Sequence, residues 1–202
     1  MYEVTLINDG ETTVIHHPHF GTPKVQTGEI KKRVNEADGF TFTILPNNPG
    51  YDKIRPLKTL VKVLNLKTGK YEFDGRVLMP TETMNDNGSV SKRYLCESEL
   101  GYLNDSVQRH GEYHDISVRD FLQVMIDNHN NDIAHDDIDK TFQVGIVEVD
   151  TSTGTLYRYL GYDPTLESID DNLISRLGGE LRVRKENGVR YLDYLIQVGE
   201  VK

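Results

Sequence analysis

The sequence predicts a mainly β protein with an α+β second part: an antiparallel β-barrel, followed by a smaller α+β domain with two helices and hairpins. In residues 1–105, short apolar alternations are separated by turn residues, which is typical of an antiparallel barrel or sandwich. Beyond residue 110, helical periodicity appears between hairpin signals. The charge changes at the same place, because residues 1–110 hold 14 acidic and 14 basic side chains and residues 111–202 hold 18 and 9. We therefore expect a barrel domain at 1–108 and an acidic α+β domain at 109–202.

The strands of the first half are bounded by turn residues. Residues 40–45 alternate as FTFTIL, and the following PNNPG at 46–50 ends the strand because its prolines lack backbone donors. The apolar run 60–66 ends at KTGK and resumes at Tyr71 and Phe73, which predicts a hairpin. A further turn is predicted at 85–88 (NDNG), between strands over 76–79 and 90–95.

The second half begins with an amphipathic helix. Ser117 stands three residues before Asp120 and opens the apolar positions 121, 122, 125 and 126, so it predicts a helix with a capping box. A second helix is predicted from Pro164, with apolar residues at 166, 169, 173 and 177, and it ends at Gly178–Gly179.

Strands are predicted on both sides of the second helix. Residues 142–149 form one, and a turn at Thr153–Gly154 leads into another over 156–160. Strands over 181–184 and 189–194 flank Asn187–Gly188, the pair preferred in a type I′ turn. Because the chain ends on an apolar strand pattern over 191–201, we expect it to be part of a longer polypeptide.

The composition is that of an ordinary globular protein, with 37% hydrophobic and 27% charged residues among 202. No apolar run approaches the roughly 20 residues of a membrane-spanning helix, and no secretory signal opens the chain, so we expect no membrane anchor and synthesis in the cytoplasm. Cys96 is the single cysteine, which excludes an internal disulfide; we expect an inert, buried thiol. The net charge of −9 disfavours specific binding to nucleic acids.

Two polar clusters are candidate metal sites. His16, His17 and His19 carry imidazoles, but Pro18 interrupts them and no acidic residue or cysteine lies within four positions, so we expect an exposed loop or strand end. The second cluster is richer in oxygen ligands, but it departs from the EF-hand pattern at the sixth and twelfth positions, and no zinc motif is present. We expect it to be a solvated helix end and turn; it comprises Asp127, Asn128, His129, Asn130, Asn131, Asp132, His135, Asp136 and Asp137.

No motif for nucleophilic catalysis or for phosphate binding is found in the sequence. Carboxylate pairs such as Glu97/Glu99 and Asp170/Asp171 are present, but acidic residues are common in this chain and their spacing does not separate them from surface charge. We therefore assign no catalytic, cofactor-binding or metal-binding residue, and we expect a protein that is not an enzyme and has no cofactor.

Several segments resemble the prophage tail endopeptidase family, the tail-associated lysin or hub proteins of long-tailed phages that infect Gram-positive hosts. Residues 35–49 (NEADGFTFTILPNNP) look like its opening strand and turn, and residues 96–106 (CESELGYLNDS) are similar to the segment after its first barrel. The helix over 121–128 and the segments 177–184 (LGGELRVR) and 191–194 (YLDY) are similar to its later helix and helix-to-hairpin region. The resemblance covers nearly all of the chain, and its motifs are structural.

The resemblance implies a trimeric hub at the virion tail tip, the baseplate, that docks on the distal tail protein and contacts the tape-measure protein and other tail-tip proteins. Phage DNA would pass through it without specific binding. Peptidoglycan cleavage in that family is attributed to C-terminal extensions, so no catalytic residue is transferred to this chain. Two alternatives stay open: a cell-wall hydrolase with a metal site built from His129, His135, Asp136 or His16, and a host-surface carbohydrate-binding module that uses some of the eleven tyrosines.

Overall fold

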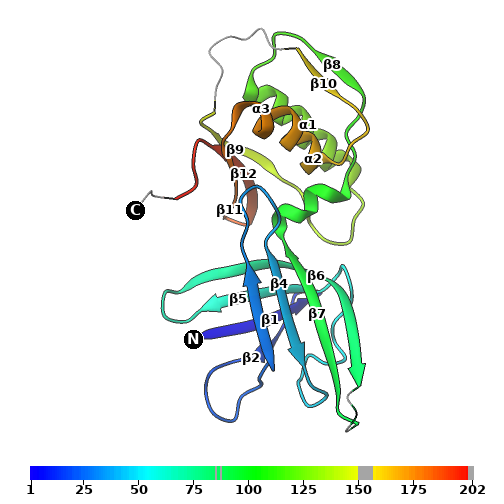
Figure 1. Cartoon of the computed structure of the whole chain (residues 1–202), viewed down its shortest axis with the longest axis vertical. Helices are drawn as coiled ribbons and strands as arrows, with labels where there is room; N and C mark the ends of the chain where they lie inside the picture. The colour runs from blue at the N-terminus through cyan, green and yellow to red at the C-terminus, as the bar shows by residue number, and fades with distance from the viewer. Residues whose placement is uncertain (85, 87, 150–156, 200–202) are drawn as a thin grey trace. The chain divides into compact units, whose positions relative to one another are not determined.

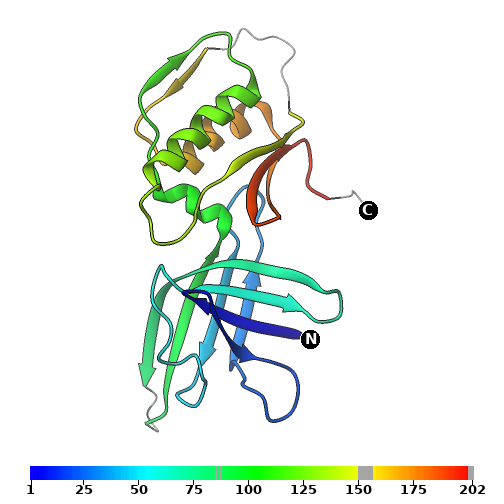
Figure 2. The same ribbon diagram turned by 180° about the vertical axis from the view of Figure 1, so that it is seen from behind.

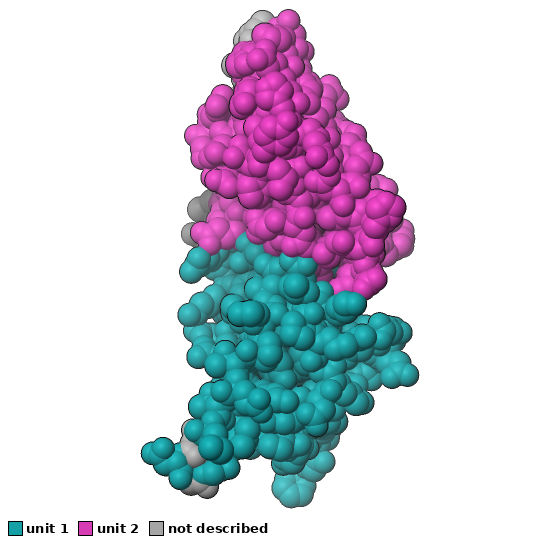
Figure 3. All heavy atoms as spheres, turned by 90° about the vertical axis from the view of Figure 1, so that its right-hand side faces the viewer, with its two compact units in different colours: residues 1–33, 37–99 teal, residues 34–36, 100–202 magenta. Residues whose placement is uncertain are grey.

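The computed structural model describes residues 1–84, 86, 88–149 and 157–199. Contacts between Cα atoms divide the chain into unit 1, residues 1–33 and 37–99, and unit 2, residues 34–36 and 100–202 (Figure 3). Each unit has a buried apolar core of its own. No helix among the described residues combines the length and the apolar character that crossing a membrane requires.

Unit 1 is built from one antiparallel sheet of seven strands (Figure 1). Its strands, in chain order, are β1 (Tyr2–Asn8), β2 (Glu11–His16), β3 (Thr27–Lys31), β4 (Gly39–Ile44), β5 (Leu60–Asn65), β6 (Lys70–Met84) and β7 (Val90–Ser98). The order across the sheet is β2-β1-β5-β6-β7-β4-β3. The strands predicted over 40–45, 60–66, 76–79 and 90–95 are confirmed, and the strand predicted to resume at Tyr71 and Phe73 is continuous with 76–79 in β6. The turn predicted at 85–88 lies partly outside the described residues. The first hairpin, β1–β2, was missed.

The first and last strands of this sheet, β2 and β3, do not pair with each other, so the sheet is open. The closed barrel that the sequence predicts is therefore not seen among the described residues. β2 and β3 are the two edge strands, and each pairs with one neighbour. The segment between them contains Pro18 and Pro23, which lack the backbone donor that a ladder strand needs. The sheet nevertheless bends over one core, where Phe42 stacks on Tyr94 and Phe40 contacts Phe73.

Gly75 lies where β6 pairs with β5 and β7 at once, and substitution there should weaken unit 1. A Cβ atom at Gly75 would stand 2.0 Å from the backbone oxygen of Glu97, so alanine must push two paired strands apart. We expect Gly75→Ala to lower the free energy of unfolding by about 2 kcal/mol, as overpacking does. Urea denaturation followed by circular dichroism measures it. Gly39→Ala is the matched control, because nothing lies within 4 Å of its Cβ; equal stability of the two variants would contradict the prediction.

Unit 2 combines helices with two small sheets (Figure 2). Its elements are the 3₁₀-helix η1 (Glu99–Asp105), β8 (Gly111–Tyr113), α1 (Val118–Asp132), β9 (Gln143–Val147), β10 (Arg158–Leu160), α2 (Thr165–Ile169), the π-helix η2 (Asp170–Ile174), α3 (Ser175–Leu177), β11 (Glu180–Glu186) and β12 (Val189–Leu195). Asn35 also belongs to this unit, because its side chain bonds the backbone of Gly179 and Leu181 at 3.1 and 2.7 Å.

The predicted ends of the helices and the last hairpin are confirmed. Ser117 caps α1 by accepting from the backbone N–H of Asp120 at 3.0 Å. Pro164 precedes α2, and Gly178, with φ 74°, follows α3. Asn187 and Gly188 both have positive φ between β11 and β12, as a type I′ turn requires.

Apart from the last hairpin, the pairing of the strands in unit 2 differs from the prediction: the strands predicted over 142–149 and 156–160 do not form a hairpin with each other. β9 pairs in parallel with β12, and β10 pairs with β8, a three-residue strand that the sequence analysis missed. The turn predicted at Thr153–Gly154 lies outside the described residues. The second helix is also interrupted by a π-helical turn, where the buried Arg158 donates to the Asn172 carbonyl at 3.0 Å.

Candidate functional site

The histidines of 16–19 have separate partners in the structure. His16 ends β2 and accepts the Val25 N–H on Nδ1 at 3.2 Å, which removes that nitrogen as a ligand. Burial lowers the pKa of His16, and Lys24 and His17 lower it further. Nε2 of His17 lies 3.8 Å from Glu3. Across the residues that the structure describes, no three His, Cys, Asp or Glu side chains gather as a cation would need.

Most of the cluster over 127–137 is exposed at the end of α1 and in the following turn, as the sequence predicts, but His129 and Asn130 depart from this prediction. His129 is 0% exposed. Asn130 donates to the Phe142 carbonyl at 2.8 Å and accepts the Phe142 N–H at 2.9 Å. The reason is that the chain after α1 returns along the end of the helix. Asp136 accepts from Lys140 Nζ at 2.6 Å, whereas His129 Nε2 bonds the Lys140 carbonyl, so the two side chains contact different groups of Lys140.

His129 is the centre of a buried chain of polar side chains in unit 2. Its Nδ1 lies 2.7 Å from Ser106 Oγ, and its Nε2 lies 3.0 Å from the Lys140 carbonyl. Ser106 Oγ lies 2.6 Å from Thr165 Oγ1, which accepts from Gln108 Nε2 at 2.7 Å. All four residues are buried, with exposed fractions of at most 1%: Ser106, Gln108, His129 and Thr165. The chain joins α1, α2 and the segment after η1.

These contacts fix every proton in the chain. A carbonyl accepts only, so His129 Nε2 carries hydrogen; in the neutral imidazole Nδ1 is then the acceptor. Ser106 then donates to Nδ1, and the Thr165 hydroxyl donates to Ser106. Burial lowers the pKa of His129, as do Lys140 and Arg190; the bond to Lys140 and the charge of Asp105 act against this. The imidazole is therefore held neutral in one tautomer.

The Ser106–His129 pair resembles a nucleophile with its base only in composition. A catalytic serine must reach a substrate, whereas Ser106 is 1% exposed and its oxygen bonds two side chains. His129 is oriented by a carbonyl and has no carboxylate on Nε2. The geometry accounts for the pair as a joint between helices. Its only sequence signal is the polar residue His129 at a position continuous with the apolar face of α1.

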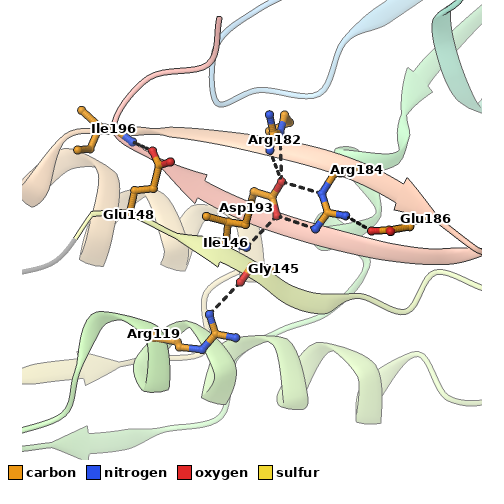
Figure 4. Close-up of polar contacts among 9 residues, drawn as sticks. All are labelled: Arg119, Gly145, Ile146, Glu148, Arg182, Arg184, Glu186, Asp193 and Ile196. Carbon is orange, nitrogen blue, oxygen red and sulfur yellow. Dashed lines mark hydrogen bonds and ion pairs between the residues drawn. The ribbon is translucent and has the colours of Figure 1, made fainter.

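A second polar network is centred on Asp193 in the three-stranded sheet of unit 2 (Figure 4). The carboxylate is 0% exposed and accepts from the Ile146 N–H at 2.9 Å. Nη2 of Arg182 donates to it at 2.7 Å, and Nε of Arg184 donates at 3.2 Å. Burial alone would raise the pKa of Asp193, but the Ile146 N–H and the two guanidinium groups together hold it below its usual value.

The Asp193 carboxylate replaces a backbone partner where the pairing of β9 with β12 is irregular. The register of β9 against β12 shifts between Leu192 and Tyr194, so the Ile146 N–H bonds the side chain of Asp193. Gly145 is required beside it, since a Cβ there would stand 2.0 Å from Asp193 Oδ1. The arrangement is a structural clamp, and the sequence analysis missed it.

The remaining candidates have ordinary partners. Cys96 is a buried free thiol, as expected, and burial raises its pKa. Glu97 accepts from Arg76 Nε at 2.7 Å, which leaves it paired inside the sheet of unit 1. Asp170 accepts from the Ser175 hydroxyl at 3.4 Å, at the surface of the second helix.

A groove of about 500 Å³ opens in unit 1 at the seam between the two ends of the sheet. Its lining residues come from β1, β2, β5, β3, β4 and the segment before β3: Tyr2, Val4, His16, Val63, Val25, Gln26, Thr27, Gly28, Ile30 and Phe40. This volume is within the range of small-molecule and peptide sites. The sequence gives no motif for it, because its walls come from both ends of the sheet.

No protein-family model matches the sequence, and no curated protein matches it significantly. Solved structures do match. The tail protein from Neisseria meningitidis is 13% identical with a TM-score of 0.54, and the match covers 95% of this chain and 50% of that one. The 43 kDa tail protein of prophage MuSo2 from Shewanella oneidensis is 15% identical with a TM-score of 0.58, covering 96% and 53%.

A third similar structure is not described as a phage protein. It is a component of the type VI secretion system of E. coli, described as similar to the T4 bacteriophage tail proteins gp27 and gp5; it is 8% identical with a TM-score of 0.53, covering 85% of this chain and 48% of that one. At such identities the likeness shows a shared fold, one found in phage tail proteins and in a type VI secretion component. The chain spans about half the length of these structures.

Proposed function

We propose that this chain is a structural component of a phage or prophage tail tip, where it forms a homotrimeric hub that closes or extends the tail tube and docks on the distal tail protein. The observation that carries the proposal is the fold, which three tail or secretion-system proteins share with TM-scores of 0.53 to 0.58 over 85 to 96% of this chain. The two polar networks of unit 2 support a structural role, because their side chains bond one another inside the fold.

The proposal assigns a part to each half of the chain. Residues 1–108 are the tube-like domain of the hub, and residues 109–202 are its acidic α+β domain. The tape-measure protein and other tail-tip proteins are the further partners, and assembly takes place in the bacterial cytoplasm. The excess of acidic residues after residue 110 would repel phosphate groups, so DNA can pass without being bound.

The test is the mass of the protein in solution. We expect sedimentation equilibrium to give three times the mass of the 23.1 kDa chain, either alone or after mixing with the distal tail protein of the same phage. A trimer that takes up the distal tail protein supports the proposal. A monomer that stays monomeric with that partner present would contradict it.

A further inference from the structure

The groove of unit 1 runs beside backbone that has no partner. β3 pairs with β4 on one side, and nothing pairs with its other edge among the described residues. On the opposite wall, β1 pairs with β2 only from Val4 onward, so Tyr2 and Glu3 lack a partner on that side. Two strand edges therefore present N–H and C=O groups toward one opening.

The side chains that line the groove are uncharged. Its floor is the apolar core surface of Val4, Phe40 and Val63, and His16 and Gln26 stand at its polar rim. His16 is held toward its neutral form by the lowered pKa described above. Glu29 and Lys31 of β3 are absent from the lining and lie 3.6 Å from each other. An occupant that complements this lining has no charge on the side that enters the groove.

Gly28 leaves room in the middle of β3. Its φ is not in the left-handed region, and a Cβ there would lie 3.6 Å from the Phe40 ring, an ordinary contact. Neither backbone conformation nor crowding therefore requires glycine. A glycine inside a strand without such a reason is typical of a place where another backbone approaches closely.

The exposed part of β6 contains a proline at its unpaired edge, and β3 does not. The distal half of β6 pairs with β7 alone, and there Pro80 removes a backbone donor. Proline is a common means of preventing a foreign strand from pairing with an edge. β3 contains no proline, so its edge keeps every donor over Thr27–Lys31.

We propose that this groove binds an uncharged, extended segment of a partner protein, which adds as a strand to the free edge of β3. Main-chain hydrogen bonds to β3 would supply affinity, and apolar side chains at alternate positions would fill the space above Gly28 and Phe40. The chemistry of two backbone edges favours a polypeptide over a small apolar molecule, which has no repeating donors and acceptors to match them.

The test is an NMR titration of the ¹⁵N-labelled chain with a capped hexapeptide of alternating threonine and valine. We expect saturable shifts confined to the amides of β3 and of Tyr2–Val4. The same peptide, N-methylated at alternate residues, keeps its side chains but cannot pair, so it should bind at least tenfold more weakly. Equal binding of both peptides, or no saturable shift, would overturn the proposal.

Two variants locate the site. Gly28→Leu places a side chain in the groove and should weaken peptide binding at least tenfold while the unfolding midpoint is kept. Thr41→Leu is the matched control: Thr41 pairs with Glu29 on the next strand, outside the lining, and should bind the peptide as the parent does. If the β3 amides shift with protein concentration in the absence of peptide, the occupant is a second copy and the proposal fails.

Discussion

Replacing Asp193 with alanine should lower the free energy of unfolding of unit 2 by about 3 kcal/mol, the lower end of the cost of breaking a buried ion pair. The substitution removes the acceptor of the Ile146 N–H and the carboxylate that Arg182 and Arg184 share, which leaves Arg184 paired with Glu186 alone. The lower end applies because both guanidinium groups are partly exposed and water screens them. Differential scanning calorimetry should show a fall of roughly 15 °C in the midpoint of unit 2.

Asp193→Asn separates the hydrogen bond from the charge. Asparagine keeps an oxygen that can accept the Ile146 N–H, so we expect an intermediate loss of stability. Because the pKa of Asp193 is lowered in the folded state, its contribution is present above the unfolded pKa of about 3.9 and is lost as the pH falls through the folded value. Asp193→Ala with the parent's midpoint at neutral pH would contradict the account.

Part of the Asp193 network could be predicted from the sequence. The Asn187–Gly188 turn fixes the register of the last hairpin, and that register places Arg182 opposite Asp193. The register therefore predicts a cross-strand ion pair between Arg182 and Asp193. The burial of the carboxylate does not follow, because it depends on β9, which arrives from more than 45 residues earlier and pairs in parallel with a register shift.

Local sequence signals predicted local structure correctly. They did not predict features that depend on contacts distant in sequence. The cap of α1 and the end of α3 depend on residues within one turn of the helix, and both were predicted. The π-helical turn was not, since the buried Arg158 that bonds its Asn172 carbonyl lies 14 residues upstream. The open seam of the sheet also escaped prediction, because apolar alternation reports the faces of a strand and not whether its edges are paired.

The burial of His129 also depends on contacts distant in sequence, and substitution of this residue should have the second large effect on stability. The polar residues around it suggested a solvated helix end, but Ser106 and the Lys140 carbonyl meet it inside unit 2. His129→Leu should lower the free energy of unfolding by about 3 kcal/mol, because it leaves a buried hydroxyl without its acceptor and a carbonyl without its donor. Chemical denaturation followed by circular dichroism measures the loss. His135→Leu, at an exposed position six residues on, is the control and should change stability little.

The pH dependence of stability tests the tautomer argument independently. Since burial lowers the folded pKa of His129, the unfolded chain takes up a proton near pH 6.5 that the folded chain refuses. The contribution of neutral His129 is therefore complete above pH 6.5 and is lost as the pH falls toward the folded pKa. Protonation would also reverse the hydroxyls of Ser106 and Thr165, and the Thr165 hydroxyl would then reach only the Ser106 carbonyl at 3.4 Å. The protection factors of the α1 amides, which correct for the slower chemical exchange at low pH, should fall between pH 7 and pH 5 in the parent and in His135→Leu but not in His129→Leu. The same fall in all three would assign the effect to another group.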